Sequence, residues 1–388
     1  MCATEDRRVG ERDRAAGEED VRVMVLAAGL GTRLMPLTGE ISKPMVPIVN
    51  RPVMEHLMRL LARCGFRDLM VNLHYLPDAI TAHFEDGSQW DLNINYSREE
   101  RLLGTAGGVK KCEEFFGGKT FLVVSGDALT DVNLTELLAF HRERNALATI
   151  VVTPVEDTSH YGVVLAEEDG RVVGFQEKPP GAEALSNVAN SGIYVFEPEV
   201  FDLMPSEGPY DFGSELFPLL VDEGAALFSW RHDYYWNDVG SIEEYQRGNF
   251  DALEGRVTVE MPGVEIAPAV WVGHDSRIDE DILMTPPVCI GDRCVVERGA
   301  RIIGPVVVGP DTTVGAGAVL HRGIKWGGSY IGRDASMVGS IIGARSRIGD
   351  RAAVLNGVVL GSDCEVKDGI VIHESVKIMP GTVVDGES

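Results

Sequence analysis

The chain has 388 residues, of which 44% are hydrophobic and 24% charged, as expected of a folded protein with two or three domains. Its 35 basic and 60 acidic residues leave a net charge of −25, which argues against binding to a nucleic-acid backbone. No apolar run approaches the roughly 18 residues that a membrane span needs. The six cysteines are scattered without a Cys-x-x-Cys pair, which favours reduced thiols and a cytoplasmic location.

Residues 1–20 are dense in charge and lack an apolar stretch, which predicts a disordered tail rather than a secretory signal. Residues 21–255 then alternate short apolar runs with segments of helical periodicity, the pattern of a layered α/β domain. The expected buried strands are 21–27, 69–73 and 121–124, and the expected helices are 53–64, 134–144 and 241–253.

A glycine-rich turn, Ala28–Leu34, follows the first expected strand. Such a turn can present backbone N–H groups to a phosphate chain. It is not a Rossmann fingerprint, because Leu34 stands where the third glycine would be. It is not a Walker A loop either, because no Gly-Lys-Ser/Thr follows. Arg33 and Lys43 are cations ten residues apart beside this turn, and together they would suit a leaving pyrophosphate.

The stretch Gly29-Leu-Gly-Thr-Arg-Leu-Met-Pro-Leu-Thr, with Lys43-Pro44 after it, resembles the signature of the sugar-1-phosphate nucleotidyltransferases, or NDP-sugar pyrophosphorylases. The resemblance implies an α/β, Rossmann-like domain with a mixed central sheet over residues 21–255. It also implies transfer of a nucleotidyl group from a nucleoside triphosphate (NTP) to a sugar 1-phosphate, with release of pyrophosphate. Further motifs follow in the family's order: Leu103-Gly-Thr-Ala-Gly107, Ser125-Gly-Asp127, Tyr161-Gly-Val163, Glu177-Lys-Pro179, Asn190-Ser-Gly192 and Trp236-Asn-Asp-Val-Gly240.

For this reaction a protein must align two polyanions and neutralise their charge. The resemblance assigns catalysis to Arg33, Lys43 and Lys178. It assigns Asp127 and Asp238 to Mg²⁺, for which carboxylate oxygens are suitable hard ligands. The implied nucleotide-binding residues are Ala28, Gly29, Gly31, Thr32, Gly104, Thr105 and Asp127, and the implied sugar-binding residues are Gly162, Glu177 and Asn190.

Each of these residues also has a plainer interpretation. An isolated aspartate is more often a helix cap or a turn residue than a metal ligand. Glu177 and Lys178 could form an exposed ion pair of little energetic value. Gly162 and Asn190 are common turn formers. The ordered series of motifs favours the functional interpretation, whereas Glu99 and Glu100 are interpreted as solvated charge.

Residues 256–388 carry a six-residue repeat of apolar anchors that fits a triangular coil of three short parallel strands. We expect glycines to occupy corners of unusual φ and small residues to fill the narrow interior. The pattern resembles the left-handed parallel β-helix of hexapeptide repeats. The anchors recur from Ile266 to Leu320 and from Ile342 to Val384; glycine follows Val272, Ile290, Val308, Val314, Ile342, Ile348 and Leu360; the small residues are Cys294, Ala300, Thr312, Ala318, Ser346, Ala352, Cys364 and Thr382.

Residues 321–341 break the phase of this repeat and are expected to form a protruding loop with Trp326 and Tyr330. The segment Val257–Met261 is expected to cover the first coil, whereas four residues follow Val384. An uncovered coil end favours self-association, so the β-helix is predicted to be structural and to form a homo-oligomer. Cys289, Cys294 and Cys364 are interpreted as packing residues, and His274, His321 and His373 as surface residues.

The base loop 103–107 and the β-helix together most resemble mannose-1-phosphate guanylyltransferases, which favours GTP and mannose 1-phosphate as substrates. Gly108-Val-Lys110 and Ser125-Gly-Asp127 depart from that branch, so a glucose-1-phosphate uridylyl-, thymidylyl- or adenylyltransferase stays open. A regulatory paralogue without catalysis is a second class, although Arg33, Lys43 and Lys178 are all present. A bifunctional enzyme with an acyltransferase site in the β-helix is a third class.

Overall fold

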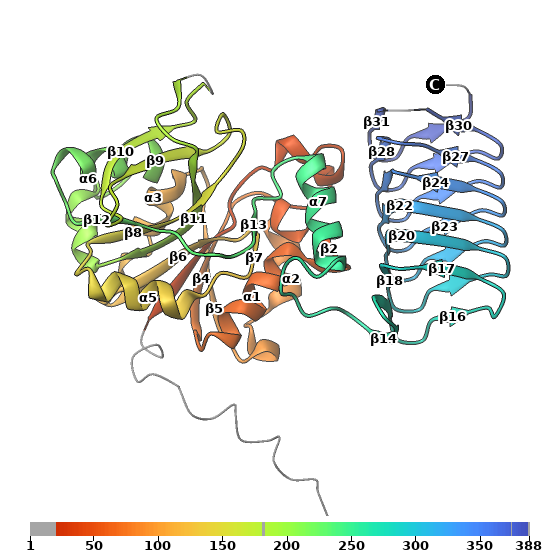
Figure 1. The fold of residues 1–388 in the computed structure, drawn as a ribbon, viewed down its shortest axis with the longest axis horizontal. Helices are drawn as coiled ribbons and strands as arrows, with labels where there is room; N and C mark the ends of the chain where they lie inside the picture. Colours follow the sequence, from red (N-terminus) through yellow and green to blue (C-terminus); the bar gives the residue numbers. More distant parts are fainter. Residues whose placement is uncertain (1–20, 181–182, 374, 387–388) are drawn as a thin grey trace, which may run out of the picture.

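The computed structural model describes residues 21–180, 183–373 and 375–386, which form two parts lying side by side (Figure 1). The first part is an α/β domain, and the second is a column of short stacked strands. The predicted tail 1–20 lies outside the described residues. None of the helices in the described ranges is long and apolar enough to cross a membrane.

A nine-stranded mixed sheet forms the centre of the N-terminal domain, as expected. Its strand β1 (Arg22–Leu26) lies between β4 and β6 and runs parallel to both, whereas β11 runs antiparallel to β6. The main path is β10-β9-β11-β6-β1-β4-β5; β8 pairs with β11, and β12 pairs with β8. These strands are β4 Asp68–Leu73, β5 Asn93–Arg98, β6 Phe121–Ser125, β8 Ala148–Pro154, β9 Gly162–Ala166, β10 Val172–Glu177, β11 Val188–Phe196 and β12 Leu227–Trp230.

Both faces of this sheet are buried, because successive side chains of β1 point to opposite faces and those on each face are apolar. Val23 and Val25 join the core under α1, α2 and α5, while Met24 joins the core under α3, α4 and α6. The expected strands and helices all occur, with ends within one residue of those predicted. The helices are α1 Val53–Arg63, α2 Pro77–Phe84, α3 Gly104–Lys110, α4 Glu113–Phe116, α5 Leu134–Glu143, α6 Phe217–Asp222 and α7 Ile242–Leu253.

The second part is a parallel β-helix whose strands pair in register from coil to coil. The apolar anchors from Ile290 onward are buried, Val272, Ile278 and Met284 are partly buried, and Cys294, Ala300 and Ala318 fill the interior as expected. Its strands are β14 Val264–Ala267, β15 Val270–Val272, β16 Arg277–Ile278, β17 Leu283–Thr285, β18 Val288–Ile290, β19 Val295–Val296, β20 Arg301–Val308, β21 Thr313–Val314, β22 Val319–Lys325, β23 Tyr330–Ile331, β24 Ser336–Val338, β25 Ile341–Ile342, β26 Arg347–Ile348, β27 Ala353–Val354, β28 Val359–Leu360, β29 Glu365–Val366, β30 Val371–Ile372, β31 Lys377–Ile378 and β32 Val383–Val384.

The prediction of a protruding loop at 321–341 is wrong, because β22, β23 and β24 continue the coil through this segment. Val308 pairs with Lys325, and Lys325 pairs with Ile342, so each of these two coils has 17 residues. The next coil, from Ile342 to Leu360, has 18. Two one-residue deletions therefore shift the phase of the sequence pattern without interrupting the stack of strands.

Two further expectations about the repeat need correction. Ile266 is not an inward anchor: it lies on the exposed strand β14, which pairs antiparallel with β15. The glycines after the anchors are required by close stacking rather than by unusual φ. A Cβ atom at Gly291 would lie 2.5 Å from the backbone nitrogen of Pro310 in the next coil. The positive φ falls two residues later, at Arg293.

One outward face of the β-helix packs against the N-terminal domain. Outward side chains in consecutive coils form an apolar column, and they share a buried cluster with residues of α7 and of the segment 34–53. This covering is larger than the predicted contact of Val257–Met261 with the first coil, although Val257 does join the same cluster. The outward column consists of Cys289, Val307, Ile324, Ile341 and Val359.

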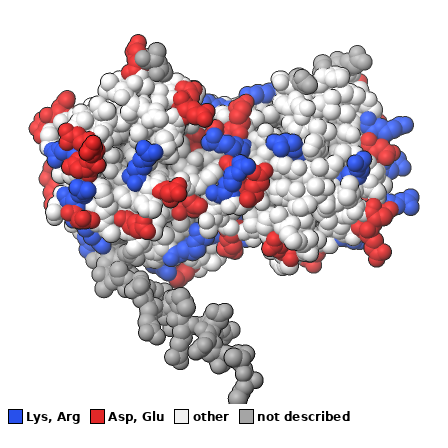
Figure 2. Space-filling model, viewed as in Figure 1, with Lys and Arg blue, Asp and Glu red and all other residues white. Residues whose placement is uncertain are grey.

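Polar contacts across this interface tie it to two short strands, β2 (Pro47–Ile48) and β3 (Arg51–Pro52). The indole Nε1 of Trp326 donates to the hydroxyl of Tyr245 on α7 at 2.7 Å, and that hydroxyl donates to the carbonyl of Pro47 at 2.8 Å. The Asn50 amide donates to the Val308 carbonyl at 2.9 Å. On the face shown in Figure 2, acidic and basic side chains are interspersed over the N-terminal domain.

Lys325 occupies an inward anchor position between Val308 and Ile342, and its side chain is fully buried. Its ammonium donates to the carbonyls of Trp326 at 3.0 Å and Ile342 at 3.3 Å, and also to that of Gly343. Burial in the coil interior lowers the pKa of this lysine well below its usual value. The three carbonyls supply the acceptors that a buried ammonium requires.

We predict that Lys325→Glu strongly destabilises the β-helix, because a carboxylate would face three carbonyl oxygens without a donor. The expected loss is about 3 kcal/mol or more in the free energy of unfolding, measured by thermal and denaturant unfolding. Lys377→Glu, on the exposed outer surface of β31, makes the same change in charge and serves as the control. Equal stability of the two variants would contradict the assignment.

Candidate active site

The site lies where two neighbouring parallel strands of the sheet end. Leu26 at the end of β1 is paired with Ser125 at the end of β6, so the segments that follow both strands emerge at one edge. The Gly126 amide donates to the Leu26 carbonyl at 2.8 Å and joins the two segments. This brings the turn Ala28–Leu34 beside Asp127.

The glycine-rich turn is open to solvent at Gly29, Thr32 and Arg33, whereas Ala28 is buried at the end of β1. Gly31 has φ +64°, and a Cβ atom there would lie only 2.9 Å from Cβ of Lys43. The Thr38 hydroxyl donates to the Gly31 carbonyl at 2.8 Å and holds the turn closed. The sequence-predicted phosphate turn is therefore a preformed loop packed directly on the Lys43 side chain.

Lys43 joins the two predicted metal ligands. Its ammonium lies 2.7 Å from Oδ2 of Asp127 and donates to the main-chain carbonyl of Asp238 at 2.7 Å. The Lys43 side chain is 10% exposed, so this ion pair is largely shielded from solvent. Residues separated by almost 200 positions in the chain thus meet in one cluster.

The Asp238 carboxylate has its own partners. It accepts from the Tyr161 hydroxyl at 3.3 Å and from the Gly240 amide at 3.1 Å, and Arg33 approaches within 3.8 Å. Burial, and then the nearby Asp238 charge, raise the pKa of Tyr161, so its hydroxyl stays protonated and can donate. The chain is also fixed after Asp238, because Ser241, three residues later, caps α7 and accepts from the Glu244 amide.

The predicted base loop forms the start of α3 and is anchored to a segment that the sequence analysis did not single out. Gly104 has φ +74°, and a Cβ atom there would lie 2.5 Å from the Tyr210 carbonyl oxygen. The Thr105 hydroxyl donates to the Asp211 carboxylate at 2.8 Å and accepts from the Phe212 amide at 2.9 Å. Nothing in the local sequence around 210–212 signals this contact, since it depends on tertiary packing.

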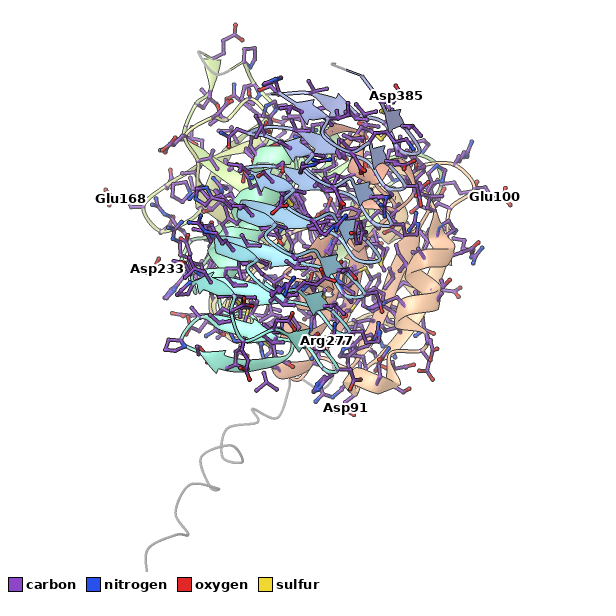
Figure 3. All side chains as sticks on the ribbon, turned by 90° about the vertical axis from the view of Figure 1, so that its right-hand side faces the viewer. Asp91, Glu100, Glu168, Asp233, Arg277 and Asp385 are labelled. Atoms are coloured by element: carbon purple, nitrogen blue, oxygen red, sulfur yellow. The ribbon has the colours of Figure 1, made fainter. Side chains whose placement is uncertain are left out.

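The interpretation of Glu99 as solvated charge is wrong. Glu99 is buried and accepts from the Asn72 amide at 2.8 Å and from the Leu103 backbone N–H at 3.0 Å. Asn72 in turn accepts from the backbone N–H of Ala27 at 2.8 Å. This relay connects the phosphate turn to the base loop. Glu100, by contrast, is exposed and points away from the molecule (Figure 3).

The predicted sugar-binding residues form a neighbouring group. Glu177 and Lys178 make an ion pair at 3.0 Å, and the Lys178 side chain is 62% exposed. The Lys178 amide donates to the Tyr161 carbonyl at 3.1 Å, which connects this group to the Asp238 cluster. Gly162 leaves room first for the Phe175 ring and then for Glu177, because a Cβ atom there would lie 2.6 Å from Cζ of Phe175 and 3.1 Å from Oε2 of Glu177.

Asn190 on β11 makes local contacts. Its amide donates to the Tyr194 hydroxyl at 2.9 Å, and its oxygen accepts from the Gly192 amide at 2.9 Å. Glu177 approaches Gly213, and Asp211 accepts from the Gly213 amide, so the sugar group is also linked to the base loop. A continuous series of contacts therefore connects Thr105, through Glu177, to the group formed by Lys43, Asp127 and Asp238.

The donor set suits a cation held jointly with a ligand. Nowhere in the described part of the chain do three or more His, Cys, Asp or Glu side chains gather as a complete metal cage. Asp127 and Asp238 supply hard carboxylate oxygens, and the Lys43 ammonium already places a positive charge against the Asp127 carboxylate and the Asp238 main-chain carbonyl. Such a pair fits Mg²⁺, which retains waters and shares phosphate oxygens with its protein site.

Comparison with known proteins identifies the family. The nucleotidyl transferase family model matches residues 22–255, which is more than half of the chain. The chain belongs to the nucleotidyl transferase family. A second model, the GMPPB C-terminal domain, matches residues 302–387 within the β-helix.

Relatives of similar length carry two kinds of name. A UTP–glucose-1-phosphate uridylyltransferase from Synechocystis is 38% identical, with 94% of each chain covered. A probable mannose-1-phosphate guanylyltransferase from Oryza sativa is 32% identical over 93% of this chain and 96% of that one. The mannose-1-phosphate guanylyltransferase of Mycobacterium tuberculosis is 33% identical over 79% of this chain and 80% of that one.

The fold also resembles solved structures. A putative glucose-1-phosphate thymidylyltransferase from Bacillus anthracis superimposes with a TM-score of 0.55 at 23% identity, covering 62% of this chain and 97% of that one. At this identity the likeness concerns the fold alone.

We predict that Gly31→Ala and Gly29→Ala have different effects on stability. Alanine at position 31 would have an unfavourable positive φ, and its Cβ atom would clash with Lys43. The free energy of unfolding should therefore fall by about 1–2 kcal/mol. Gly29 has open space around it, so Gly29→Ala should unfold like the wild-type protein. Denaturant unfolding of both variants tests this contrast. An unchanged midpoint for Gly31→Ala would show that the turn is not held in the described conformation.

Proposed function

We propose that this protein transfers a nucleotidyl group from an NTP to a hexose 1-phosphate, releasing pyrophosphate and forming an NDP-sugar. The observation that carries the proposal is the convergence of Arg33, Lys43, Asp127 and Asp238 beside the glycine-rich turn. A phosphate oxygen of the sugar phosphate attacks the α-phosphorus of the NTP, and the bond from that phosphorus to the bridging oxygen of pyrophosphate breaks. The work of the protein is alignment and charge neutralisation.

On the nucleotide side, the backbone N–H groups from Ala28 to Thr32 would hold the triphosphate. Arg33 and Lys43 would balance the charge that builds up on the leaving pyrophosphate. The exposed Arg33 is free to reach a ligand, whereas Lys43 approaches from within the domain. Gly104 and Thr105, at the start of α3, would contact the base.

The family generally uses Mg²⁺, and the residues that would hold it here are Asp127 and Asp238. When bound, the metal would neutralise phosphate charge and hold the reacting groups in line. Tyr161 keeps the Asp238 carboxylate oriented by donating its hydroxyl proton in a hydrogen bond. Asp127 stands at the end of a buried strand, which gives its carboxylate a rigid support.

On the sugar side, Lys178 would act as a point charge on the phosphate of the sugar. Lys178 directly follows β10 and precedes Pro179 and Pro180, and its backbone has a strained positive φ of 46°. Glu177 and Asn190 would accept hydrogen bonds from sugar hydroxyls, and Gly162 would allow close approach of the sugar ring. The contact between Lys178 and Tyr161 couples this half of the site to Asp238.

Two substrate pairs are candidates. GTP with mannose 1-phosphate is favoured by the base-loop motif and by the match of the β-helix to the GMPPB C-terminal domain. UTP with glucose 1-phosphate is favoured by the Synechocystis relative, which is 38% identical over nearly the full length. Gly108-Val-Lys110 departs from the guanylyl pattern and weakens the case for the first pair, so thymidylyl and adenylyl transfer to glucose 1-phosphate also stay open.

A pyrophosphate-release assay tests the function. GTP, UTP, dTTP and ATP are each combined with mannose, glucose and N-acetylglucosamine 1-phosphates in the presence of Mg²⁺. We expect one pair to exceed the others by about 100-fold in kcat/KM, since mismatched polar groups in a base pocket are costly. Asp127→Asn should lower kcat for that pair by at least about 100-fold while leaving the unfolding midpoint within a few degrees.

Two results would contradict this proposal. Absence of release with every pair would favour the regulatory class, in which sugar nucleotides are bound without turnover. Near-normal turnover by a folded Asp127→Asn protein would show that Asp127 is not a metal ligand.

We propose that the β-helix also mediates homo-oligomerisation. One of its faces is already covered by the N-terminal domain of the same chain, so the contact falls on the coil ends or the remaining faces. The last coil exposes Met379 and Val383, each with 51% of its surface accessible. Val264 and Ile266 are similarly exposed on β14 at the opposite end. Apolar side chains at an open strand edge favour pairing with a second copy.

Light scattering after size-exclusion chromatography measures this association. We expect the full chain to have at least twice the monomer mass, and Met379→Glu with Val383→Glu to shift it toward the monomer. Leu185→Glu, at a residue of the N-terminal domain that is 56% exposed, is the matched control and should leave the mass unchanged. A monomeric wild-type protein at micromolar concentration would refute the proposal.

A further inference from the structure

Lys43 makes a contact that differs from the one its proposed phosphate-binding role requires. Its ammonium lies between the Asp127 carboxylate and the Asp238 main-chain carbonyl, 2.7 Å from each oxygen. Lys43 is thus an ion-pair partner of Asp127. The cation in contact with the proposed metal ligand Asp127 is therefore a side chain of the protein itself.

An ammonium and a divalent metal cannot share this position. A metal bound to Asp127 would lie close to the Lys43 ammonium, and two unscreened positive charges at that separation repel each other strongly in a partly buried site. Without Lys43, the carboxylates of Asp127 and Asp238 would repel each other and attract a cation more strongly. Lys43 in this position would therefore lower the affinity of the free protein for metal.

The nearby turn offers Lys43 an alternative partner. Its Cβ packs against Gly31, so the base of the side chain already lies beside the proposed triphosphate cradle. An ammonium on four methylenes can exchange one anionic partner for another by rotation about side-chain bonds. A bound triphosphate would draw the ammonium away from Asp127 and free that carboxylate.

We infer that Lys43 is an internal counter-ion that occupies the metal position until the nucleotide binds, so that metal and triphosphate enter the site cooperatively. This inference rests on the proposed function for the identity of the site. Arg33 does not serve the same purpose, because it is 53% exposed and approaches Asp238 only at 3.8 Å. Lys43 is in this respect a positioning residue for the metal as well as a phosphate contact.

The test measures metal binding without substrates, by Mn²⁺ titration of the full-length protein monitored by electron paramagnetic resonance. Lys43→Met should bind Mn²⁺ at least about tenfold more tightly than the wild-type protein, within the usual range of coupling between sites. Lys43→Gln, which keeps a polar group facing the Asp238 carbonyl, should show the same direction. Lys178→Met removes a lysine from the same cleft without touching Asp127 or Asp238, and should leave Mn²⁺ affinity unchanged.

A double-mutant cycle gives the second criterion. Adding Asp127→Asn to Lys43→Met should abolish the gain in Mn²⁺ affinity, because the released carboxylate is then absent. Unchanged or weaker Mn²⁺ binding by both Lys43 variants would overturn the inference, as would an equal gain in Lys178→Met. Tighter Mn²⁺ binding in a protein that turns over no substrate pair would defeat the proposed function and leave the inference standing.

Discussion

The buried hydroxyl of Tyr245 joins the three parts of the molecule on which the site depends. It accepts from Trp326 of the β-helix and donates to Pro47, and Tyr245 itself lies on α7. Pro47 follows the turn that carries Lys43, and α7 follows the loop that carries Asp238. The apolar outer column of the β-helix also shares one buried cluster with Val46, close to Lys43, and with Val239, next to Asp238.

The charges of the site are balanced within the chain before any ligand arrives. Lys43 and Arg33 offset Asp127 and Asp238, and Lys178 offsets Glu177. In the proposed reaction, a phosphate group or a metal ion would replace one existing partner in such a pair. A protein with a net charge of −25 can in this way present local cations to anionic substrates without a basic surface.

Several features were predictable because they depend on short-range patterns. Apolar periodicity located three strands and three helices of the N-terminal domain to within one residue, and the six-residue repeat predicted the β-helix and most of its buried anchors. The errors have a common origin. Glu99, the phase shift at Lys325 and the stacking glycines all depend on neighbours from distant parts of the chain, whose positions a local pattern does not contain.

The sequence by itself determined the two-part architecture and the residue types of the candidate site, because periodicity and motif order are properties of the chain alone. Only the tertiary structure decided which of those residues meet. Lys43 reaches Asp238 across 195 positions because β1 and β6 end at one edge of the sheet and α7 packs on the β-helix. Contacts of that range arise from the packing of whole elements, so no segment of the sequence encodes them separately.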